Sequence, residues 1–455
     1  MSAETVKTEK TTAKFSLKEL SDIFNFNCPN NEQLFSICTD SRTINKNQIF
    51  LPLSGEKFDG HNFINEILGK GISFSFCDVR KISKVDEKLR KSLILVDNTL
   101  DAYHRVASYY RDKINPKVIA ITGSSGKTTV KELITSVILQ KHKVHKTKAN
   151  FNNEIGVPKT ILEMLEDTEI LVLELAMRAK GEINFLSRTA KPDVAVITNV
   201  GSAHIGRLGN LQSIMEAKSE ILEHIKVNGT AILNNDLDLI KLAKMKLEGR
   251  NIQFQTFDLN EASNISFKDG RATFTFKNKN YTVNATGQIH VLNSICAIKL
   301  AHFLKLSDEE IKKGLLEFKL PEGRGNIIRL KDNMFLVDES YNANPDSLKV
   351  AVTNLIECWG KDYNKILVIG ELAELGEHEN KLLKELNTWL LDRKLSCVIT
   401  VGDKLKEIKN ATNVKNTNEC CAILNKLLIP KSVVLIKGSH IAGLEKVVNY
   451  FIEKQ

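Results

Sequence analysis

The sequence lacks any apolar run long enough to cross a bilayer. Its first residues, MSAETVKTEKTTAK, have no apolar signal core and contain two glutamates. We therefore expect no membrane insertion, and we interpret residues 1–14 as a disordered tail. The eight cysteines form no CxxC pair and no Cys/His cluster with zinc spacing. Reduced thiols and a cytoplasmic location are the corresponding expectations.

The sequence also lacks an arginine-rich arm and any basic run interleaved with aromatic residues. Its net charge of +9 comes from dispersed lysines, a pattern typical of a solvated surface rather than a nucleic-acid interface. An anionic small-molecule substrate is also consistent with this excess of positive charge. With 42% hydrophobic and 26% charged residues over 455 positions, the chain is predicted to form two or three globular domains.

The pattern of apolar runs divides the chain into three parts. Residues 15–114 contain short apolar runs between polar turns, which indicates a mixed α/β unit ending near the linker RDKINPK. Residues 115–322 alternate strand and helix and include a predicted hairpin, ISFKDGRATFTFKNKNYTV, and a helix starting near Asn293. Residues 323–455, after the hinge candidate PEGRGN, alternate again. This alternation predicts doubly wound sheets with ligands at the carboxyl ends of the strands.

The segment TGSSGKTT at 122–129 follows an apolar strand and opens a helical pattern. Gly123 and Gly126 allow a tight backbone curl whose amides, with the helix dipole, favour a phosphate. Lys127 would supply charge to the terminal phosphates, and the Thr128 hydroxyl would ligate Mg²⁺. The motif therefore predicts binding of a nucleoside triphosphate. It departs from the usual P-loop because Ile121 stands in place of the first glycine.

Two polar residues end neighbouring predicted strands, and a lysine follows on a helix. Glu174 ends ILVLE and could hold Mg²⁺, and His204 follows DVAVITNV. Carboxyl ends of parallel strands share one sheet edge, so we expect both near the phosphate turn. Lys218, in SIMEAKSEIL, is by composition a surface lysine.

A series of motifs, taken in order, resembles the Mur ligases of peptidoglycan synthesis: ITGSSGKTT, ANFNNEIGVPKT, LELAMRAKGEI, NVGSAHI, EAKSEIL, DESYNANPDSL, GELAELGEHE and LIKGS. The resemblance extends from about residue 36 to 450. It implies an α/β fold with three domains: a UDP-muramoyl substrate-binding domain (15–114), a central ATP-binding domain with a P-loop-type parallel sheet (115–322) and a Rossmann-like carboxyl-terminal domain (323–455).

The resemblance also implies an activity, which is ATP-dependent amide-bond formation through an acyl phosphate, with Mg²⁺. SYNANP together with AELG favours the family member that adds D-alanyl-D-alanine to UDP-N-acetylmuramoyl-tripeptide. A monomer is the expected state. The sequence does not decide whether the third residue of the tripeptide is diaminopimelate or lysine.

Several site residues are implied by matching the family motifs. Catalytic roles fall on Lys127, Glu174, His204 and Lys218, and the metal ligands are Thr128, Glu174, His204 and a carbamylated Lys218. ATP contacts are Gly123, Ser124, Ser125, Gly126, Lys127, Thr128, Thr129, Asn293, Arg324 and Asp338. Substrate contacts are Ser41, Arg42, Gly55, Asp59, Gly60, His61, Asn152, Asn153, Tyr341, Asn342, Asn344, Lys437 and Ser439.

Two positions depart from the family pattern. The adenine-side motif usually reads G-x-H-x-x-x-N, whereas GQIHVLN has Ile289 at the histidine position and His290 after it. KGSH has His440 where many relatives have arginine. Two other readings stay open: a related ligase that adds glutamate to folate or a diamino acid to the muramoyl dipeptide, and a regulatory nucleotide-binding protein.

Overall fold

The computed structural model describes residues 13–28 and 32–454. Most of the predicted tail, residues 1–12, lies outside this range. Ala13 is buried, and its amide donates to the carbonyl of Leu162 at 2.8 Å. In the described part of the chain, no helix has the length and apolar character that a bilayer crossing requires.

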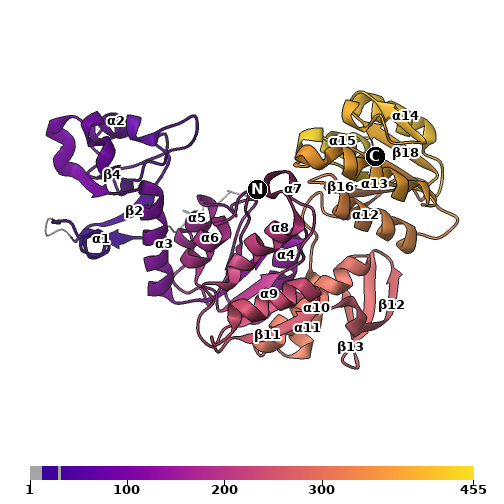
Figure 1. Ribbon diagram of the computed structural model, residues 1–455, viewed down its shortest axis with the longest axis horizontal. Coiled ribbons are helices and arrows are strands. Elements are labelled where there is room, and N and C mark those ends of the chain that lie inside the picture. Colours follow the sequence, from indigo (N-terminus) through magenta and orange to yellow (C-terminus); the bar gives the residue numbers. More distant parts are fainter. Residues whose placement is uncertain (1–12, 29–31, 455) are drawn as a thin grey trace, which may run out of the picture. The chain divides into compact units, whose positions relative to one another are not determined.

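The chain separates into two compact units. The first comprises Met1–Ala120, Lys143–Leu175 and Phe185–Asp193, and the second comprises Ile121–His142, Ala176–Asn184 and Val194–Gln455. Figure 1 colours both along the sequence. The expected boundaries at 114/115 and 322/323 stay predictions.

The amino-terminal part of the first unit contains a five-stranded sheet in the order β1-β2-β3-β4-β5. Its strands are β1 (Phe15–Ser16), β2 (Leu34–Cys38), β3 (Gln48–Phe50), β4 (Ser75–Asp78) and β5 (Leu93–Val96). Only β1 runs antiparallel to its neighbour. The helices of this part are α1 (Leu17–Phe24), α2 (Ile64–Gly69) and α3 (Thr99–Ile114). Two of the short apolar runs expected in residues 15–114, QIFLPL and SLILVD, contain β3 and β5.

A six-stranded sheet has the order β11-β10-β9-β6-β8-β7. Its strands are β6 (Lys117–Thr122), β7 (Val144–Lys146), β8 (Ile170–Glu174), β9 (Val194–Ile197), β10 (Thr230–Asn234) and β11 (Gln253–Phe257). All residues of β8 and β9 are buried, as continuous apolar strands covered on both faces require. The associated helices are α4 (Lys127–Ile138), α5 (Gly156–Leu162), α6 (Glu182–Ala190), α7 (Ile205–Leu208), α8 (Leu211–Ser219) and α9 (Leu237–Leu247).

The predicted hairpin is confirmed as part of a three-stranded antiparallel sheet, β12 (Ala262–Lys268), β13 (Arg271–Phe276) and β14 (Lys279–Val283). Its first turn is formed by Asp269 and Gly270, both with positive φ. The next helix, α10 (Gln288–Phe303), begins five residues before Asn293, so the predicted start was too late. Helix α11 (Asp308–Glu317) follows and starts with a capping box at Ser307.

The last part of the second unit is a doubly wound sheet in the order β15-β16-β20-β17-β18-β19. Its strands are β15 (Asn326–Arg329), β16 (Phe335–Glu339), β17 (Asn364–Ile369), β18 (Cys397–Val401), β19 (Ala411–Val414) and β20 (Ser432–Lys437). Only β15 is antiparallel. Its helices are α12 (Pro345–Cys358), α13 (Glu379–Leu391), α14 (Thr417–Leu427) and α15 (Glu445–Glu453) (Figure 1).

Alternate residues of β20 face opposite sides of this sheet. Val433 and Leu435 pack in the core formed with α12 and α13, whereas Val434 and Ile436 pack in the core formed with α14 and α15. A strand with a core on each face must be apolar throughout, which explains the run VVLI. The polar residues Lys437 and Ser439 follow where the strand ends.

Candidate active site

The phosphate turn lies between β6 and α4 in the second unit, and the segment after β9 holds its shape. The amide of Ser125 donates to Asn199 Oδ1 at 2.9 Å, and Thr198 Oγ1 donates to the Ser125 carbonyl at 2.6 Å. At Gly123 an added Cβ would lie 1.8 Å from Thr198 Oγ1. A side chain at position 123 therefore cannot be accommodated without moving Thr198.

The end of the turn places Lys127 at the first residue of α4. Gly126 adopts φ +76°, in the left-handed region that favours glycine, and precedes the helix directly. The ammonium of Lys127 donates to the carbonyl of Gly123 at 2.8 Å, back across the curl. The backbone amides at the helix N-terminus and this side-chain ammonium together make the concave turn electropositive. Phosphate binds to such an arrangement.

Lys218, on α8, is 1% exposed. It is therefore not the surface lysine that the composition of its segment suggested. Burial, and then the positive charge of Lys127, lower the pKa of its ammonium well below the usual value. Among the described residues, no acidic side chain forms an ion pair with it. A lysine in this setting favours the neutral amine, which is the form that reacts with carbon dioxide to give a carbamate.

His204 is the N-cap residue of α7, with φ +68°, and contacts Glu374 in the last part of the same unit. Its Nδ1 is 2.6 Å from Glu374 Oε2, a close contact without good hydrogen-bond alignment. The nearby His204 ring holds the pKa of the Glu374 carboxyl below its usual value. The amide of Gly206 also donates to the Glu374 carbonyl at 3.2 Å. Glu374 belongs to the AELG motif, so two motifs distant in sequence meet here.

In the first unit, Glu174 ends β8 and is 2% exposed. Asn152 Nδ2 donates to its Oε1 at 2.8 Å, which joins two of the predicted site residues. Asn153 has a local role, because its Oδ1 accepts from the amide of Gly156 at 2.9 Å at the start of α5. The NFNN segment is therefore a structured loop that presents Asn152 to the strand end.

A charged cluster in the amino-terminal part of the first unit centres on Asp59. Its carboxylate accepts from His61 Nδ1 at 2.8 Å, Lys81 Nζ at 3.0 Å and Lys84 Nζ at 2.9 Å. Burial raises the pKa of Asp59, but the bonds from Lys84, Lys81 and His61 outweigh it and lower that pKa. Arg42 instead pairs with Asp40. Among the described residues, Ser41 and Arg42 share no hydrogen bond with this cluster.

The last part of the second unit brings together most of the predicted contacts near the ends of β16 and β20. The buried Lys437 donates to Glu339 Oε2 at 2.9 Å and to the carbonyl of Asn342 at 3.0 Å. Arg324 lies over the Tyr341 ring, 4.1 Å from its centroid. Asn344 is used as the N-cap of α12 and accepts from the Ser347 amide.

Three further predicted residues of the second unit make local hydrogen bonds or are buried. Asp338 Oδ1 accepts from the Ser340 hydroxyl at 2.6 Å, and Ser439 is buried with its amide on the carbonyl of Glu371. Asn293, on α10, is also buried. His290 is buried on the same helix, and burial lowers its pKa to about 4, so the ring is neutral near pH 7.

Two family models match the chain: the Mur ligase middle domain over residues 121–301, and the Mur ligase glutamate ligase domain over residues 323–440. The chain belongs to the Mur ligase family. It is 34% identical to UDP-N-acetylmuramoyl-tripeptide--D-alanyl-D-alanine ligase of Bacillus subtilis, with 92% of this chain and 93% of the relative covered. Identity to the Escherichia coli enzyme of the same name is 30%, with 95% and 97% covered.

Solved structures of the family agree with the fold. MurF from Acinetobacter baumannii superposes with a TM-score of 0.86 at 28% identity, covering 97% of this chain and 99% of that one. MurF ligase from Thermotoga maritima in complex with ADP gives 0.82 at 28% identity, covering 92% and 97%. The expected Mur ligase α/β fold with parallel sheets is thereby confirmed. The roles of the individual site residues stay predictions.

Sequence reasoning missed several residues that contact the Mur ligase motifs. Thr198 and Asn199 hold the phosphate turn, Glu374 meets His204, and Lys81 and Lys84 bind Asp59. The first three stand within or beside quoted motifs, so the polar strand end TNVGS and the motif AELG were available signals. Nothing in the local sequence distinguishes Lys81 and Lys84 from other surface lysines.

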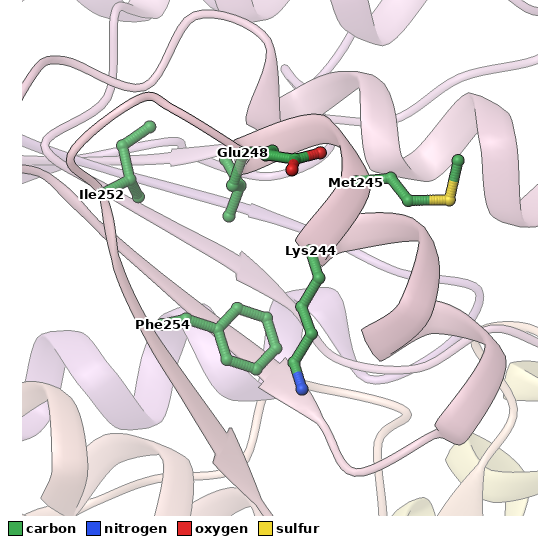
Figure 2. A pocket seen from close by; sticks show the side chains of 6 residues that line it. Lys244, Met245, Glu248, Ile252 and Phe254 are labelled. Atoms are coloured by element: carbon green, nitrogen blue, oxygen red, sulfur yellow. The ribbon is translucent and has the colours of Figure 1, made fainter.

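One surface hollow lies away from all of these residues. It has a volume of about 440 Å³ and is lined by Lys244, Met245, Leu247, Glu248, Ile252 and Phe254. Figure 2 shows the Phe254 ring beside the Lys244 side chain, between α9 and β11. None of the predicted Mur ligase site residues lines it, so we assign it no part in the activity.

Proposed function

We propose that this chain is an ATP-dependent amide-bond ligase that joins D-alanyl-D-alanine to UDP-N-acetylmuramoyl-tripeptide, releasing ADP and phosphate. The observation that carries the proposal is the phosphate turn, pinned by Thr198 and Asn199, in a chain that covers more than nine-tenths of relatives bearing that name. A structural relative solved in complex with ADP supports nucleotide binding by this chain. The names of those relatives favour the dipeptide-adding activity over the alternative, a ligase that adds glutamate to folate or a diamino acid to the muramoyl dipeptide.

In this proposal the turn binds ATP, and its outer phosphorus faces the terminal carboxylate of the tripeptide. A carboxylate oxygen forms the new bond to the γ-phosphorus while the bond to the ADP oxygen breaks. The dipeptide amine then attacks the acyl carbonyl, loses a proton and expels phosphate. The negatively charged carboxylate and triphosphate repel each other. The positive charge of Lys127 and of the α4 N-terminus offsets this repulsion.

The residues present fit magnesium. Thr128 and Glu174 offer a hydroxyl and a buried carboxylate, the hard oxygen donors that Mg²⁺ prefers, and Asn152 orients that carboxylate. Together with His204 and a carbamylated Lys218 they would hold the ions, as ligands or as orienting groups. Bound Mg²⁺ would supply positive charge that neutralises the phosphates. Carbamylation turns the Lys218 nitrogen into part of an anion, releasing one proton.

The proposal extends to the substrate side and to the cell. Gly55, Asp59, Gly60 and His61 contact the uridine nucleotide, and the Lys81 and Lys84 ammonium groups beside Asp59 add positive charge for its diphosphate. Asn293, Arg324 and Asp338 contact ATP. A cytoplasmic monomer is proposed, which is consistent with eight cysteines that are all free.

A coupled assay of phosphate release tests the function. With ATP, Mg²⁺ and UDP-N-acetylmuramoyl-tripeptide, turnover should require D-alanyl-D-alanine. Tripeptides with diaminopimelate or lysine at the third position, tested side by side, identify the acceptor. ATP hydrolysis that is indifferent to the dipeptide would instead support a regulatory nucleotide-binding protein.

A further inference from the structure

His104 lies in the middle of α3 and is 2% exposed, outside every motif that the function uses. Its Nε2 is 2.7 Å from the backbone carbonyl of Glu154, and its Nδ1 is 2.6 Å from Thr189 Oγ1. The Phe185 ring covers it at a centroid distance of 4.1 Å. All four residues belong to the first unit.

The partners determine the tautomer of the ring. A carbonyl oxygen can only accept, so Nε2 carries the hydrogen and donates to Glu154. In the neutral ring Nδ1 is then an acceptor. The Thr189 hydroxyl, which also lies 3.2 Å from the Phe185 carbonyl, donates to the nearer Nδ1. Burial lowers the pKa of His104 to about 4, which agrees with a neutral ring near pH 7.

The Glu154 carbonyl belongs to the loop that carries Asn152. This loop is attached at its end by Asn153, which accepts from the Gly156 amide, and at its middle by Asn152, which donates to Glu174. Phe151 and Ile155 are exposed, so the loop has little apolar packing of its own. A hydrogen bond from a rigid 16-residue helix is therefore a substantial restraint on it.

We propose that His104 is a positioning residue that fixes the 150–155 loop from α3 so that Asn152 stays on Glu174. It touches no substrate and acts through the Glu154 carbonyl. The inference rests on the proposed function, in which Glu174 would hold Mg²⁺ and Asn152 orients its carboxylate. It adds a control of that site from a helix of the amino-terminal part of the chain.

The test compares three variants of the full chain. His104→Leu removes the donor to Glu154, whereas His104→Gln can place an amide N–H on Glu154 and its oxygen on Thr189. His145→Leu is the matched control, because His145 Nε2 also approaches a backbone carbonyl, that of Thr160 at 2.9 Å, which belongs to α5 and not to residues 150–155. KM for the muramoyl tripeptide, the Mg²⁺ activation constant and hydrogen exchange of peptide 150–156 are measured.

His104→Leu should raise KM for the tripeptide and the Mg²⁺ activation constant about five- to tenfold, the effect of one buried hydrogen bond, and accelerate exchange of the loop. His104→Gln should restore all three to within about twofold, and His145→Leu should leave them near wild type. If His104→Leu behaves like His145→Leu, the positioning role is wrong. If wild type itself shows no dipeptide-dependent turnover, the proposed function fails, and loop exchange still reports on His104.

Discussion

Gly123 illustrates how one atom can decide whether a phosphate turn forms. Its neighbour in the turn, Gly126, has open space around a potential Cβ, whereas Gly123 faces Thr198 Oγ1. Both glycines have a positive φ, +76° at Gly126 and +153° at Gly123, so both positions favour glycine for their backbone. Gly123 is needed in addition for the close approach of the segment after β9.

Substituting the two glycines separately should show this difference. Gly123→Ala should abolish ATP binding or destabilise the protein by more than about 2 kcal/mol, because Thr198 must move. Gly126→Ala carries only backbone strain of about 1–2 kcal/mol. Nucleotide titration by calorimetry and thermal unfolding measure both effects. The double variant Gly123→Ala/Thr198→Ala should recover part of the loss, and no recovery would contradict the steric explanation.

Substitution of Lys218 should raise the stability of the protein and abolish its activity. Its pKa is lowered in the folded protein, so the unfolded chain binds the extra proton and stability rises with pH between the folded pKa and about 10.5. Lys218→Met should therefore be more stable than wild type at pH 7 by at least about 1 kcal/mol, yet be inactive. Urea unfolding without bicarbonate measures this. The advantage should disappear as pH approaches about 10.5, and an advantage independent of pH would contradict the prediction.

At the scale of elements, the phosphate turn follows strand β6, and the residues that follow the neighbouring strand β9 hold it by hydrogen bonds. Helices α4 and α12 both begin at site segments, and their polar first turns are recognisable in sequence as GKTT and NANPDS. Strand–helix alternation was predictable because residues buried on both sides of a parallel sheet must be apolar. The start of α10 was not, because its N-cap residue is Gly287, which has no side chain to form a capping hydrogen bond.

Asn199 should matter for the turn more than for the fold. Asn199→Ala removes the acceptor for the Ser125 amide and the donor to its hydroxyl, so KM for ATP should rise about tenfold. Asn416→Ala is a suitable control, since it removes the N-cap of α14 at a cost of about 1 kcal/mol. Steady-state kinetics and unfolding distinguish them. Equal effects on KM would show that general destabilisation, rather than the turn, is responsible.

At the scale of the whole molecule, the segment after β9 connects the phosphate turn with the carboxyl-terminal part of the second unit. Ser124 Oγ accepts from the Gly201 amide, and the amide and hydroxyl of Ser202 both donate to Asp346 Oδ2 at 2.7 Å. Gly206 approaches Gly376 so closely that a Cβ would lie 2.6 Å from its amide nitrogen. We expect the carboxyl-terminal part of this unit to close about PEGRGN when ligands bind, which would exclude water from the acyl phosphate.

Asp346→Ala should weaken this connection. Small-angle scattering of wild type should show a more compact particle with ATP and tripeptide than without them, and the variant should remain closer to the apo profile and lose about tenfold in kcat/KM. Asp362→Ala, which removes an exposed ion pair with Lys431, should behave as wild type. Identical wild-type profiles in both states would show that no closure occurs.

The sequence by itself determined what depends on neighbouring residues: the alternation of strands and helices, the glycine curl before Lys127, and the polar residues that end the strands. Backbone φ and the burial of a strand face are local properties, so a single sequence displays them. Only the tertiary structure decided which side chains meet, such as Asn199 with Ser125, 74 positions away, or Glu374 with His204. It also decided that Lys218 is buried and that His104 supports a loop, because burial and partners arise only when distant segments pack together.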